Sequence, residues 1–311
     1  MRVFVAGATG AIGKPLVAAL LRHGHQVIGT TRSPDRAREL EAAGATSVIL
    51  DALDRDAVVR AVLDAAPDVI VHELTAIPPD LNPRHFDRAF ALTNRLRTAG
   101  TDNLVAAAKE AGVRRFIAQS FAAWVYAREG SRVKTEADPV DAHPPTQVRR
   151  TLEAIRHVER ATLEGPFEGI ALRYGWFYGP GGLARTGPIA DALRRRRFPI
   201  VGAGTAVWSF IHLVDAAEAT ALAVEHGAPG VYNITDDEPA EIRQWLPVYA
   251  ASVGAPPPPR VPRWLGRLLG GELTVTMMNE LRGASNVKAR SAFGWELRYP
   301  SWRVGFRDGL D

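Results

Sequence analysis

The sequence predicts an α/β protein built on a doubly wound parallel sheet, with a smaller C-terminal substrate lobe. Short apolar runs rich in valine and isoleucine alternate with helix-patterned stretches through the first 176 residues. A glycine-rich turn, "AGATGAIG", follows the first of these runs directly, and the alternation gives way to glycine- and proline-rich loops after residue 176. Apolar strands that alternate with helices are typical of a parallel sheet covered on both faces. The glycine turn after the first strand indicates a sheet of the Rossmann type.

Seven runs have the length and composition of buried strands. The first six cover residues 2–8, 26–32, 47–51, 68–73, 114–120 and 169–175. The seventh, at 230–236, follows the loop-rich region and is expected to return to the same sheet. Helix patterns separate the strands, as at 11–24 and at 101–112, where Leu104, Ala107, Ala108 and Ala111 share one face.

The alternation of strand and helix patterns stops after residue 176, which predicts two structural units. We expect residues 1–176 to form a nucleotide-binding domain, with late elements at about 207–236 returning to it. Residues 177–206 and 237–311 would form the substrate lobe. Within this lobe the stretch "APPPPRVPRW" (255–264) is predicted to be a stiff connector, because proline lacks the amide donor that a helix or a central strand needs. It leads into a predicted helix, "RWLGRLLGG".

Composition excludes several classes of function. The 311 residues are 46% hydrophobic and 23% charged, and no apolar run approaches the roughly 18 residues that span a bilayer. The first residues lack a signal-peptide pattern, so we expect a cytoplasmic protein with no membrane partner. The absence of cysteine excludes thiolate metal sites, and no histidine spacing suggests another metal site. We interpret the run Arg194–Arg197 as a solvated helix end, not as a nucleic-acid site.

The glycine turn predicts a dinucleotide site. Gly7, Gly10 and Gly13 are three residues apart, and glycine permits both a tight turn and a close approach of the backbone to a pyrophosphate. The helix that follows offers free N–H groups and the positive end of its dipole. The residues of the turn that lie between these glycines, Thr9, Ala11 and Ile12, are predicted to contact the cofactor as well.

The end of the second strand predicts which cofactor binds. A carboxylate there would bind the ribose hydroxyls of NAD. This chain has "GTTRSPDR", in which Thr31 and Arg32 offer a hydroxyl and a guanidinium. Those groups suit a 2′-phosphate, so we predict NADP(H) as the cofactor.

Several segments resemble the extended short-chain dehydrogenase/reductase family of sugar epimerases, dehydratases and reductases. They are "GATGAIG", "GTDNLVAAA", "LRYGWFYGPGG", "SFIHLVDAAEA" and the tail "SNVKARSAFGWELRYPSWRVGF". The resemblance covers nearly the whole chain and implies a substrate bound between the Rossmann domain and the C-terminal lobe. It also implies a homodimer formed through helices near 85–113 and 145–165.

The resemblance assigns further cofactor contacts to residues at the strand ends. Asp51, in "ILDALD", matches the acidic residue that contacts adenine in members of the family. The other positions that the resemblance assigns to the cofactor are Ala52, Leu74, Thr75, Gln119, Tyr174 and Trp176.

One pair of family residues is missing from this chain. The family carries Tyr-x-x-x-Lys on a helix, where the tyrosine exchanges a proton with the substrate oxygen and the lysine lowers its pKa and holds the ribose. Aligning "RTLEA" with the family places Gln147 and Thr151 at these two positions. Neither residue can supply the proton, although acid–base help contributes roughly 10²–10⁴-fold to such reactions.

Three hypotheses about activity follow. The first is an NADP-dependent carbonyl reductase or alcohol dehydrogenase with a substitute acid, for which Ser120 and Tyr126 are the candidate catalytic residues. Tyr174 and Tyr178 are the next candidates for the acid, and Lys134, Arg149 or Arg150 would instead polarise a carbonyl. The second hypothesis is redox-neutral epimerisation, dehydration or isomerisation, and the third is a non-catalytic NADP(H) sensor. His72 and Glu73 are adjacent on a strand and therefore point to opposite faces, which favours structural roles.

The substrate is predicted to be a small molecule of aromatic or apolar character. The residues that border the substrate in related proteins include an unusual number of aromatic side chains: Phe121, Trp124, Phe177, Tyr178 and Trp208. Such side chains suit a ring-containing ligand better than a nucleotide sugar.

Overall fold

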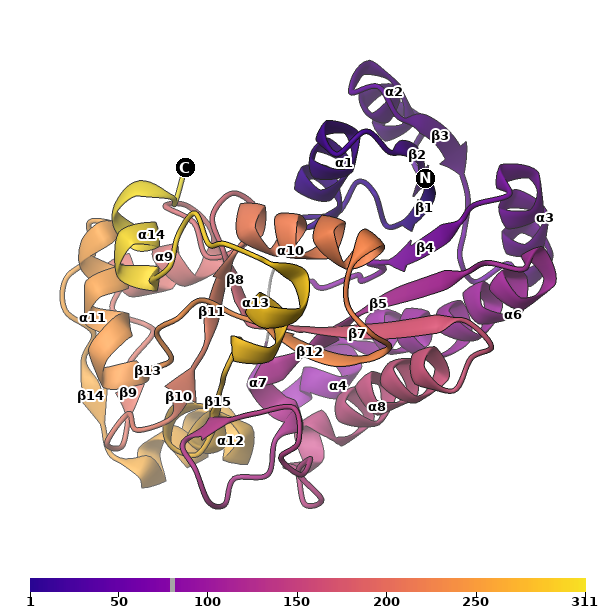
Figure 1. The fold of residues 1–311 in the computed structure, drawn as a ribbon. Coiled ribbons are helices and arrows are strands. Elements are labelled where there is room, and N and C mark those ends of the chain that lie inside the picture. Colours follow the sequence, from indigo (N-terminus) through magenta and orange to yellow (C-terminus); the bar gives the residue numbers. More distant parts are fainter. Residues whose placement is uncertain (79–81) are drawn as a thin grey trace.

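The computed structural model describes residues 1–78 and 82–311 and contains one large parallel sheet (Figure 1). The sheet has seven strands in the order β12-β7-β5-β4-β1-β2-β3, and every neighbouring pair is parallel. The strands are β1 (Arg2–Ala6), β2 (Gln26–Thr31), β3 (Thr46–Ile49), β4 (Val69–His72), β5 (Arg115–Phe121), β7 (Glu168–Tyr174) and β12 (Gly230–Ile234). Each begins within one residue and ends within two residues of the bounds of a predicted run, which confirms the Rossmann-type α/β fold.

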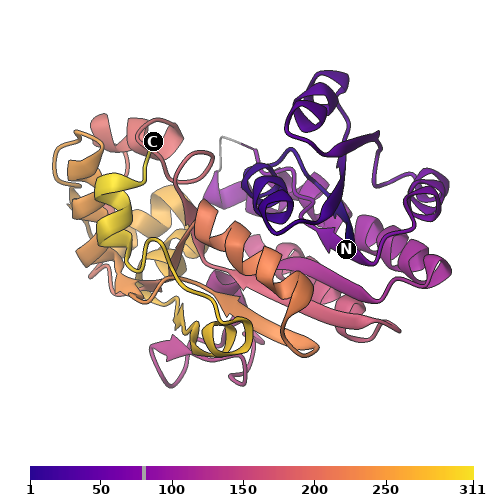
Figure 2. The same cartoon turned by 45° about the horizontal axis from the view of Figure 1, so that its top comes forward.

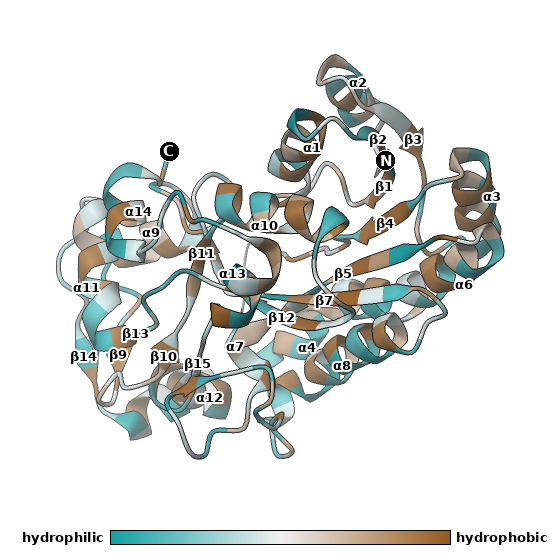
Figure 3. Cartoon of the chain, viewed as in Figure 1, coloured by the Kyte–Doolittle hydropathy of each residue, from teal (hydrophilic) through white to brown (hydrophobic). Residues whose placement is uncertain are grey.

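Helices cover both faces of this sheet (Figures 1 and 2). One face packs against α1 (Gly13–Arg22), α2 (Pro34–Ala42), α10 (Leu213–Glu225) and α13 (Val287–Phe293). The other packs against α3 (Arg55–Ala65), α6 (Thr101–Ala111) and α8 (Arg149–Leu163). Because side chains alternate along a strand, Val3 and Val5 enter the first layer and Phe4 enters the second. The apolar strands therefore lie between helices whose outer surfaces are hydrophilic (Figure 3).

A second hydrophobic core lies beside the sheet, and the elements that contribute to it lie mainly at the left of Figure 2. Its largest buried side chains include Tyr178, Phe210, Trp245, Trp302 and Phe306. Its helices are α9 (Pro188–Arg194), α11 (Ile242–Ser252), α12 (Arg263–Asn279) and α14 (Trp302–Asp308). Four short strand pairs complete this region: β8 (Trp176–Tyr178) with β11 (Phe210–His212), β10 (Val207–Trp208) with β13 (Ala240–Glu241), β9 (Ile200–Val201) with β14 (Arg260–Val261), and β6 (Val133–Lys134) with β15 (Gly283–Ala284).

The proline-rich connector leads into α12, which is longer than the predicted helix. Pro262 is the N-cap residue, and the helix continues to Asn279 across a break at Gly271. Gly271 has φ 79° and ψ −176°, which a residue with a side chain rarely adopts. The prediction ended at this glycine because the sequence pattern shows a stop there but not the second half of the helix.

A continuous helical stretch precedes the sheet strand β5. It consists of α5 (Ala91–Arg95), the π-helical segment η2 (Leu96–Gly100) and α6. Short elements on either side are η1 (Pro83–His85), α4 (Phe86–Ala89), α7 (Ala122–Val125) and η3 (Thr146–Val148). A π-helix is uncommon and is found often at functional sites. No helix in the described part of the chain is both long and apolar enough to cross a membrane.

Candidate functional site

The glycine turn lies where the strand order reverses, because β1 has β4 on one side and β2 on the other. Gly7 has φ +95°, and a Cβ atom on it would lie 2.9 Å from the carbonyl group of Glu73. A Cβ atom on Gly13 would lie 2.2 Å from the carbonyl oxygen of Gly7. The N-terminus of α1 has no side-chain cap, so the positive end of the helix dipole faces the turn and favours an anion there. The turn therefore fits the pyrophosphate of a dinucleotide.

The end of β2 is tied to this turn by two threonines. The amide of Gly7 donates to Thr30 Oγ1 over 3.3 Å, and Thr9 Oγ1 lies 3.3 Å from Thr31 Oγ1. The next residue, Arg32, has an exposed side chain. Ser33 then caps α2 by accepting from the amide of Arg36. The strand thus ends in hydroxyls and an exposed guanidinium, with no carboxylate at the position where NAD would need one.

The segment that follows β3 lies beside the end of β2 at the same edge of the sheet. Asp51 is exposed, and its Oδ1 atom accepts from the amide of Leu53 over 3.0 Å. The carbonyl of Ala52 accepts from Asn103 Nδ2 over 2.9 Å, which attaches the loop to α6. Since β3 pairs with β2, the structure brings Asp51 and Ala52 to the same edge as Thr31.

His72 ends β4 and is held as a neutral ring. Thr101 donates its hydroxyl to the carbonyl of Arg97 over 2.8 Å, so the contact between His72 Nε2 and Thr101 Oγ1 (2.9 Å) needs its proton on His72. His72 Nδ1 then accepts from the amide of Leu74. Burial, with a further contribution from the charge of Arg97, lowers the pKa of His72 to about 3. Leu74 and Thr75, both predicted to contact the cofactor, follow as half-buried residues.

Glu73 points to the opposite face and enters a chain of hydroxyl groups. Its Oε1 atom lies 2.9 Å from the hydroxyl of Tyr174, which lies 2.6 Å from Thr220 Oγ1, which donates to the carbonyl of Ala216 over 2.7 Å. The Tyr174 hydroxyl donates to Glu73. Burial raises the pKa of Glu73 to about 8, although the hydrogen bond from Tyr174 opposes the shift.

The positions matched to the family's tyrosine and lysine have other partners here. Thr151, fully buried at the start of α8, donates its hydroxyl to Asp87 Oδ1 over 2.7 Å and accepts from Asn94 Nδ2 over 3.2 Å. Asp87 also accepts from the backbone amides of Arg150 and Thr151, so it caps the helix. Gln147 lies in η3, and a Cβ atom on Gly271 would lie 3.2 Å from its Nε2 atom.

Ser120 belongs to a buried ionic network. Its hydroxyl donates to Glu159 Oε1 over 2.6 Å, and Arg173 binds both oxygens of the same carboxylate at 2.6 and 2.7 Å. All three side chains are buried. Sequence reasoning missed Glu159, although its place on the same face of α8 as Thr151 and Ile155, both buried, was the available signal.

Tyr126 lies against the same network. Its hydroxyl donates to Asn233 Oδ1 over 2.6 Å, and the guanidinium of Arg173 lies 5.1 Å from the centre of its ring. Burial raises the pKa of Tyr126, while Arg173 opposes the shift. The hydroxyls of Ser120 and Tyr126 are therefore both engaged by buried side chains, and their catalytic role stays a prediction.

The remaining candidate acids and cations lie apart from one another. Tyr174 is fully buried between the sheet and α10, and Gln119 is half-buried with an Oε1 atom that has no partner among the described residues. Lys134 is buried and pairs with Asp138 at 3.1 Å. Arg149 and Arg150 are exposed at the start of α8.

The predicted aromatic residues form a continuous cluster. Trp176 stacks on Trp208 with ring centres 4.0 Å apart, and Phe121 lies 5.1 Å from Trp176 and 5.0 Å from Trp124. Phe86 extends the cluster at 4.8 Å from Trp124. Sequence reasoning missed Phe86, which forms a stacked pair with Phe90 four residues later on the same helix face. The four-residue spacing of Phe86 and Phe90 was the sequence feature that could have predicted their packing against each other.

Two other predicted substrate residues lie elsewhere. Phe177 packs 5.2 Å from Tyr174, against the core of the sheet. Tyr178 is fully buried in the core of the lobe, 5.5 Å from Phe306. The loop that follows them reaches the glycine turn, since a Cβ atom on Gly181 would lie 3.1 Å from that of Ala11.

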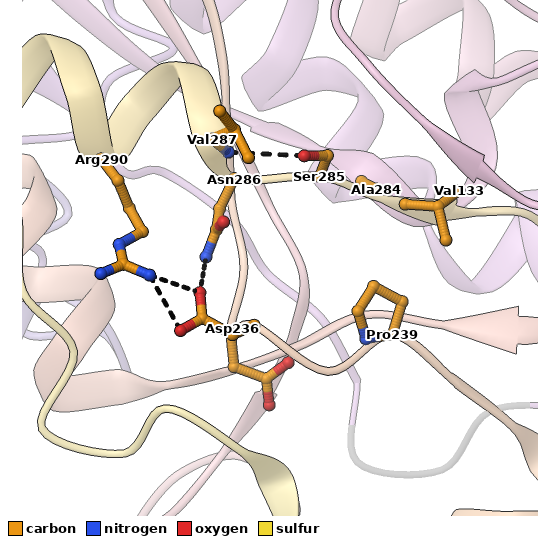
Figure 4. Close-up of a pocket in the computed structure, with 9 residues that line it drawn as sticks. Val133, Asp236, Pro239, Ala284, Ser285, Asn286, Val287 and Arg290 are labelled. Carbon is orange, nitrogen blue, oxygen red and sulfur yellow. Dashed lines mark hydrogen bonds and ion pairs between the residues drawn. The ribbon is translucent and has the colours of Figure 1, made fainter.

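A pocket of about 440 Å³ opens at the carboxyl end of β12 (Figure 4). Asp237, Asn286 and Arg290 line it and bind one another, with Arg290 donating to both oxygens of Asp237. Asp236 lines it as well and is nearly fully buried, and burial raises its pKa well above the ordinary value. None of the predicted cofactor, catalytic or substrate residues lines this pocket. In the ranges 1–78 and 82–311 no three acidic or histidine side chains gather as a metal site.

Comparison with known proteins gives close and distant relatives. The chain is 45% identical to the 3-diazoavenalumate denitrifying reductase of a Streptomyces species, with 98% of this chain and 99% of that protein covered. It is 28% identical to the 4-hydroxy-2-methyl-3-oxo-4-farnesyl-3,4-dihydroquinoline-1-oxide ketoreductase of Stigmatella aurantiaca, with 82% of this chain and 74% of that protein covered.

Solved structures share the fold over the full length. The UDP-glucose 4-epimerase of Thermotoga maritima matches with a TM-score of 0.77 at 20% identity, covering 100% of this chain and 97% of that one. A human epimerase family protein solved with NADPH matches with a TM-score of 0.73 at 19% identity, covering 100% of this chain and 99% of that one. The model of the NAD dependent epimerase/dehydratase family matches residues 3–235. This chain therefore belongs to the NAD-dependent epimerase/dehydratase family, within the extended short-chain dehydrogenase/reductase class.

Proposed function

We propose that this protein is an NADP(H)-dependent reductase that acts on a small aromatic substrate. The observation that carries the proposal is the glycine turn at the strand-order reversal, followed by the uncapped N-terminus of α1. The family match and the reductase relative at 45% identity support a redox reaction. When bound, the reduced nicotinamide would supply a hydride.

The preference for NADP(H) rests on the end of β2. Thr31 and the exposed Arg32 offer a hydroxyl and a guanidinium to a 2′-phosphate. We expect Arg32→Ala to weaken NADPH binding by roughly tenfold or more, because a hydrogen bond to a charged group contributes roughly 1.5–3 kcal/mol. NADH binding should stay within a factor of about two, since the lost contact does not involve NADH. An unchanged ratio of the two dissociation constants would overturn the NADP assignment.

The missing acid favours a particular kind of substrate. Reduction of a carbonyl group forms an alkoxide that needs a proton, and neither Gln147 nor the Thr151 hydroxyl, which is bound to Asp87, is an acid of suitable strength. Loss of nitrogen from a diazonium carbon needs no such donor. The new C–H bond uses the electron pair of the hydride, the C–N bonding pair leaves with N₂, and no oxyanion forms.

We therefore propose an aromatic diazo compound, reacting in its diazonium form, as the substrate class. The name of the 45% identical relative denotes reductive removal of nitrogen from a diazo compound, which supports this choice. The cluster of Phe121, Trp124, Trp176 and Trp208 supports an aromatic ring in the substrate.

The test compares a panel of ortho- and para-hydroxyaryl diazo compounds with a panel of aldehydes and ketones. We expect one N₂ released for each NADPH oxidised, with ¹⁵N₂ detected from labelled substrate and deuterium transferred to the ring carbon from deuterated NADPH. Oxidation of NADPH by the carbonyl panel alone would refute the diazo assignment. Binding of NADPH with no oxidation by either panel would support the sensor hypothesis instead.

Carbonyl reduction is the second candidate, since the Stigmatella relative is a ketoreductase. For that reaction Ser120 and Tyr126 are the proposed catalytic residues. The proposal requires each hydroxyl to leave its present acceptor, Glu159 or Asn233, when substrate binds. Loss of turnover by more than about 100-fold in Tyr126→Phe, with ketone substrate, would support it.

A further inference from the structure

Arg97 is a buried cation that has no counter-charge among residues 1–78 and 82–311. Its side chain lies in the π-helical segment η2, and the residue is only 5% exposed. Its Nη1 atom is buried without a hydrogen-bond partner, and no ion pair within residues 1–78 and 82–311 includes it. Burial lowers the pKa of Arg97 to about 10, so the guanidinium still carries its charge at neutral pH. A buried charge of this kind is costly unless an anion pairs with it.

The groups around this helix do not supply that anion. His72, whose pKa the charge of Arg97 helps to lower, is neutral. The helix packs against α8, whose contacts include the carboxylates of Asp87 and Glu159. Asp87 is used by the first turn of α8, and Glu159 is used by Arg173 and Ser120.

The position of Arg97 connects it to the candidate site. Its carbonyl accepts from Thr101, which accepts from His72 at the carboxyl end of β4. His72 pairs in register with Ala6, the residue before the glycine turn. This is the edge where the strand order reverses, and ligands of open α/β sheets bind in the crevice at such an edge.

A second polar atom near Arg97 also lacks a partner. Asn94, three residues earlier in the same helical stretch, donates to Thr151, while its buried Oδ1 atom accepts no hydrogen bond from the described residues. Arg97 lies within the π-helical segment itself, where the helix departs from α-helical geometry. An unpaired donor, an unpaired acceptor and an irregular helical turn thus coincide beside the sheet edge.

We propose that Arg97 binds an anionic oxygen of a molecule held in this site, either a phosphate of the cofactor or a carboxylate of the substrate. The anion would supply the missing counter-charge, and the guanidinium would fix its orientation through paired N–H groups. The inference rests on the proposed function only in that it uses the same site. Measurements of ligand binding test it without any measurement of turnover.

The experiment uses Arg97→Met, which keeps the length of the side chain and removes its charge, and Arg97→Lys, which keeps the charge. Arg115→Met is the matched control, because Arg115 is also 5% exposed but pairs with Glu168 and three backbone carbonyls. Tryptophan fluorescence measures the dissociation constants of NADPH, of inorganic pyrophosphate and of 4-hydroxycinnamate. Thermal unfolding without ligand is measured in parallel.

We expect Arg97→Met to unfold at or above the wild-type temperature, because it removes an unpaired buried charge, whereas Arg115→Met should unfold at a lower temperature. An increase of roughly tenfold or more in the dissociation constants of NADPH and pyrophosphate would identify a phosphate as the ligand. Weaker binding of 4-hydroxycinnamate, with unchanged binding of its methyl ester, would identify a carboxylate as the ligand. Arg97→Lys should recover part of the lost affinity in either case, because it keeps the positive charge.

Unchanged dissociation constants for all ligands in Arg97→Met would overturn the proposal and leave Arg97 a structural residue. The outcome does not depend on turnover. If no diazo compound is reduced, the proposed function fails while the binding results for Arg97 still decide this inference.

Discussion

The hydroxyl of Ser120 donates a 2.6 Å hydrogen bond to a carboxylate, Glu159, that also binds the guanidinium of Arg173. The three residues come from β5, α8 and β7, so the network joins two neighbouring strands to the helix that covers them. The Ser120 hydroxyl is thus engaged by a buried carboxylate at the position where the family resemblance predicts a catalytic hydroxyl.

The first prediction concerns this network. Glu159→Ala should destabilise the protein by about 3–5 kcal/mol, because it leaves the Arg173 guanidinium buried without its partner. Ser120→Ala should cost about 1.5–3 kcal/mol, since one hydrogen bond to a charged group is lost. Urea unfolding measures both changes. Glu153→Ala, at an exposed position of the same helix, is the control and should change the stability little.

Turnover separates the structural from the catalytic role of Ser120. If the role is structural, Ser120→Ala keeps a kcat within a factor of about three of wild type under conditions where it is folded. A fall of 100-fold or more with an unchanged unfolding midpoint would instead restore Ser120 as a catalytic residue.

The second prediction concerns the protonated Glu73. The raised pKa, about 8, means that the folded protein keeps a proton that the unfolded chain releases near the ordinary glutamate pKa of 4.5. The unfolded state therefore binds fewer protons between these two values, so the stability should fall as the pH rises from about 4.5 to about 8 and then level off. The expected loss is several kcal/mol, at roughly 1.4 kcal/mol for each pH unit.

Glu73→Gln should flatten this dependence, because a glutamine keeps the hydrogen bond to Tyr174 and does not titrate. Unfolding free energies at pH 5, 7 and 9 measure the slope for both proteins. Glu110→Gln, at an exposed position of α6, is the control and should leave the wild-type slope in place. Equal slopes for wild type and Glu73→Gln would mean that Glu73 is ionised in the folded protein.

The difference between what the sequence could and could not predict follows from the range of the interactions. The strands and the glycine turn depend on local patterns, so the runs at 2–8 and 114–120 were found to within a few residues of β1 and β5. The partners of Glu73 come from β7 and α10, more than 100 residues away, and no local pattern reports them. The π-helical turn at Leu96–Gly100 also escaped prediction, because it packs against α8, which is distant in the sequence and which no local pattern reports.

The third prediction concerns the cap on α8. Asp87 accepts from the amides of Arg150 and Thr151 at 3.0 and 2.9 Å, although it lies 63 residues earlier in the chain. Asp87→Ala should cost about 0.5–2 kcal/mol of stability, as the loss of an N-terminal cap does in other helices. Asp87→Asn keeps one oxygen acceptor and should recover most of the loss in urea unfolding. If Asp87→Ala were neutral, water would be satisfying these amides.

The fourth prediction concerns the aromatic cluster. Trp176 is half-buried and stacks on Trp208 with an angle of 10° between the rings, which leaves it the more accessible of the pair. Trp176→Ala should raise the KM of an aromatic substrate by roughly tenfold, because the contact area and the stacking geometry are both lost. Trp176→Phe keeps an aromatic face and should raise it by less, about threefold.

Trp264→Ala is the control for this experiment, because Trp264 lies on α12 with 68% of its surface exposed and outside the cluster. Its KM should match that of wild type. NADPH binding, measured by quenching of fluorescence, should be preserved in all three variants if Trp176 contacts the substrate alone. A loss of NADPH affinity in Trp176→Ala with no change in the KM of the substrate would assign Trp176 to the cofactor, as the family resemblance implies, and would move the aromatic contact to Phe121 and Trp124.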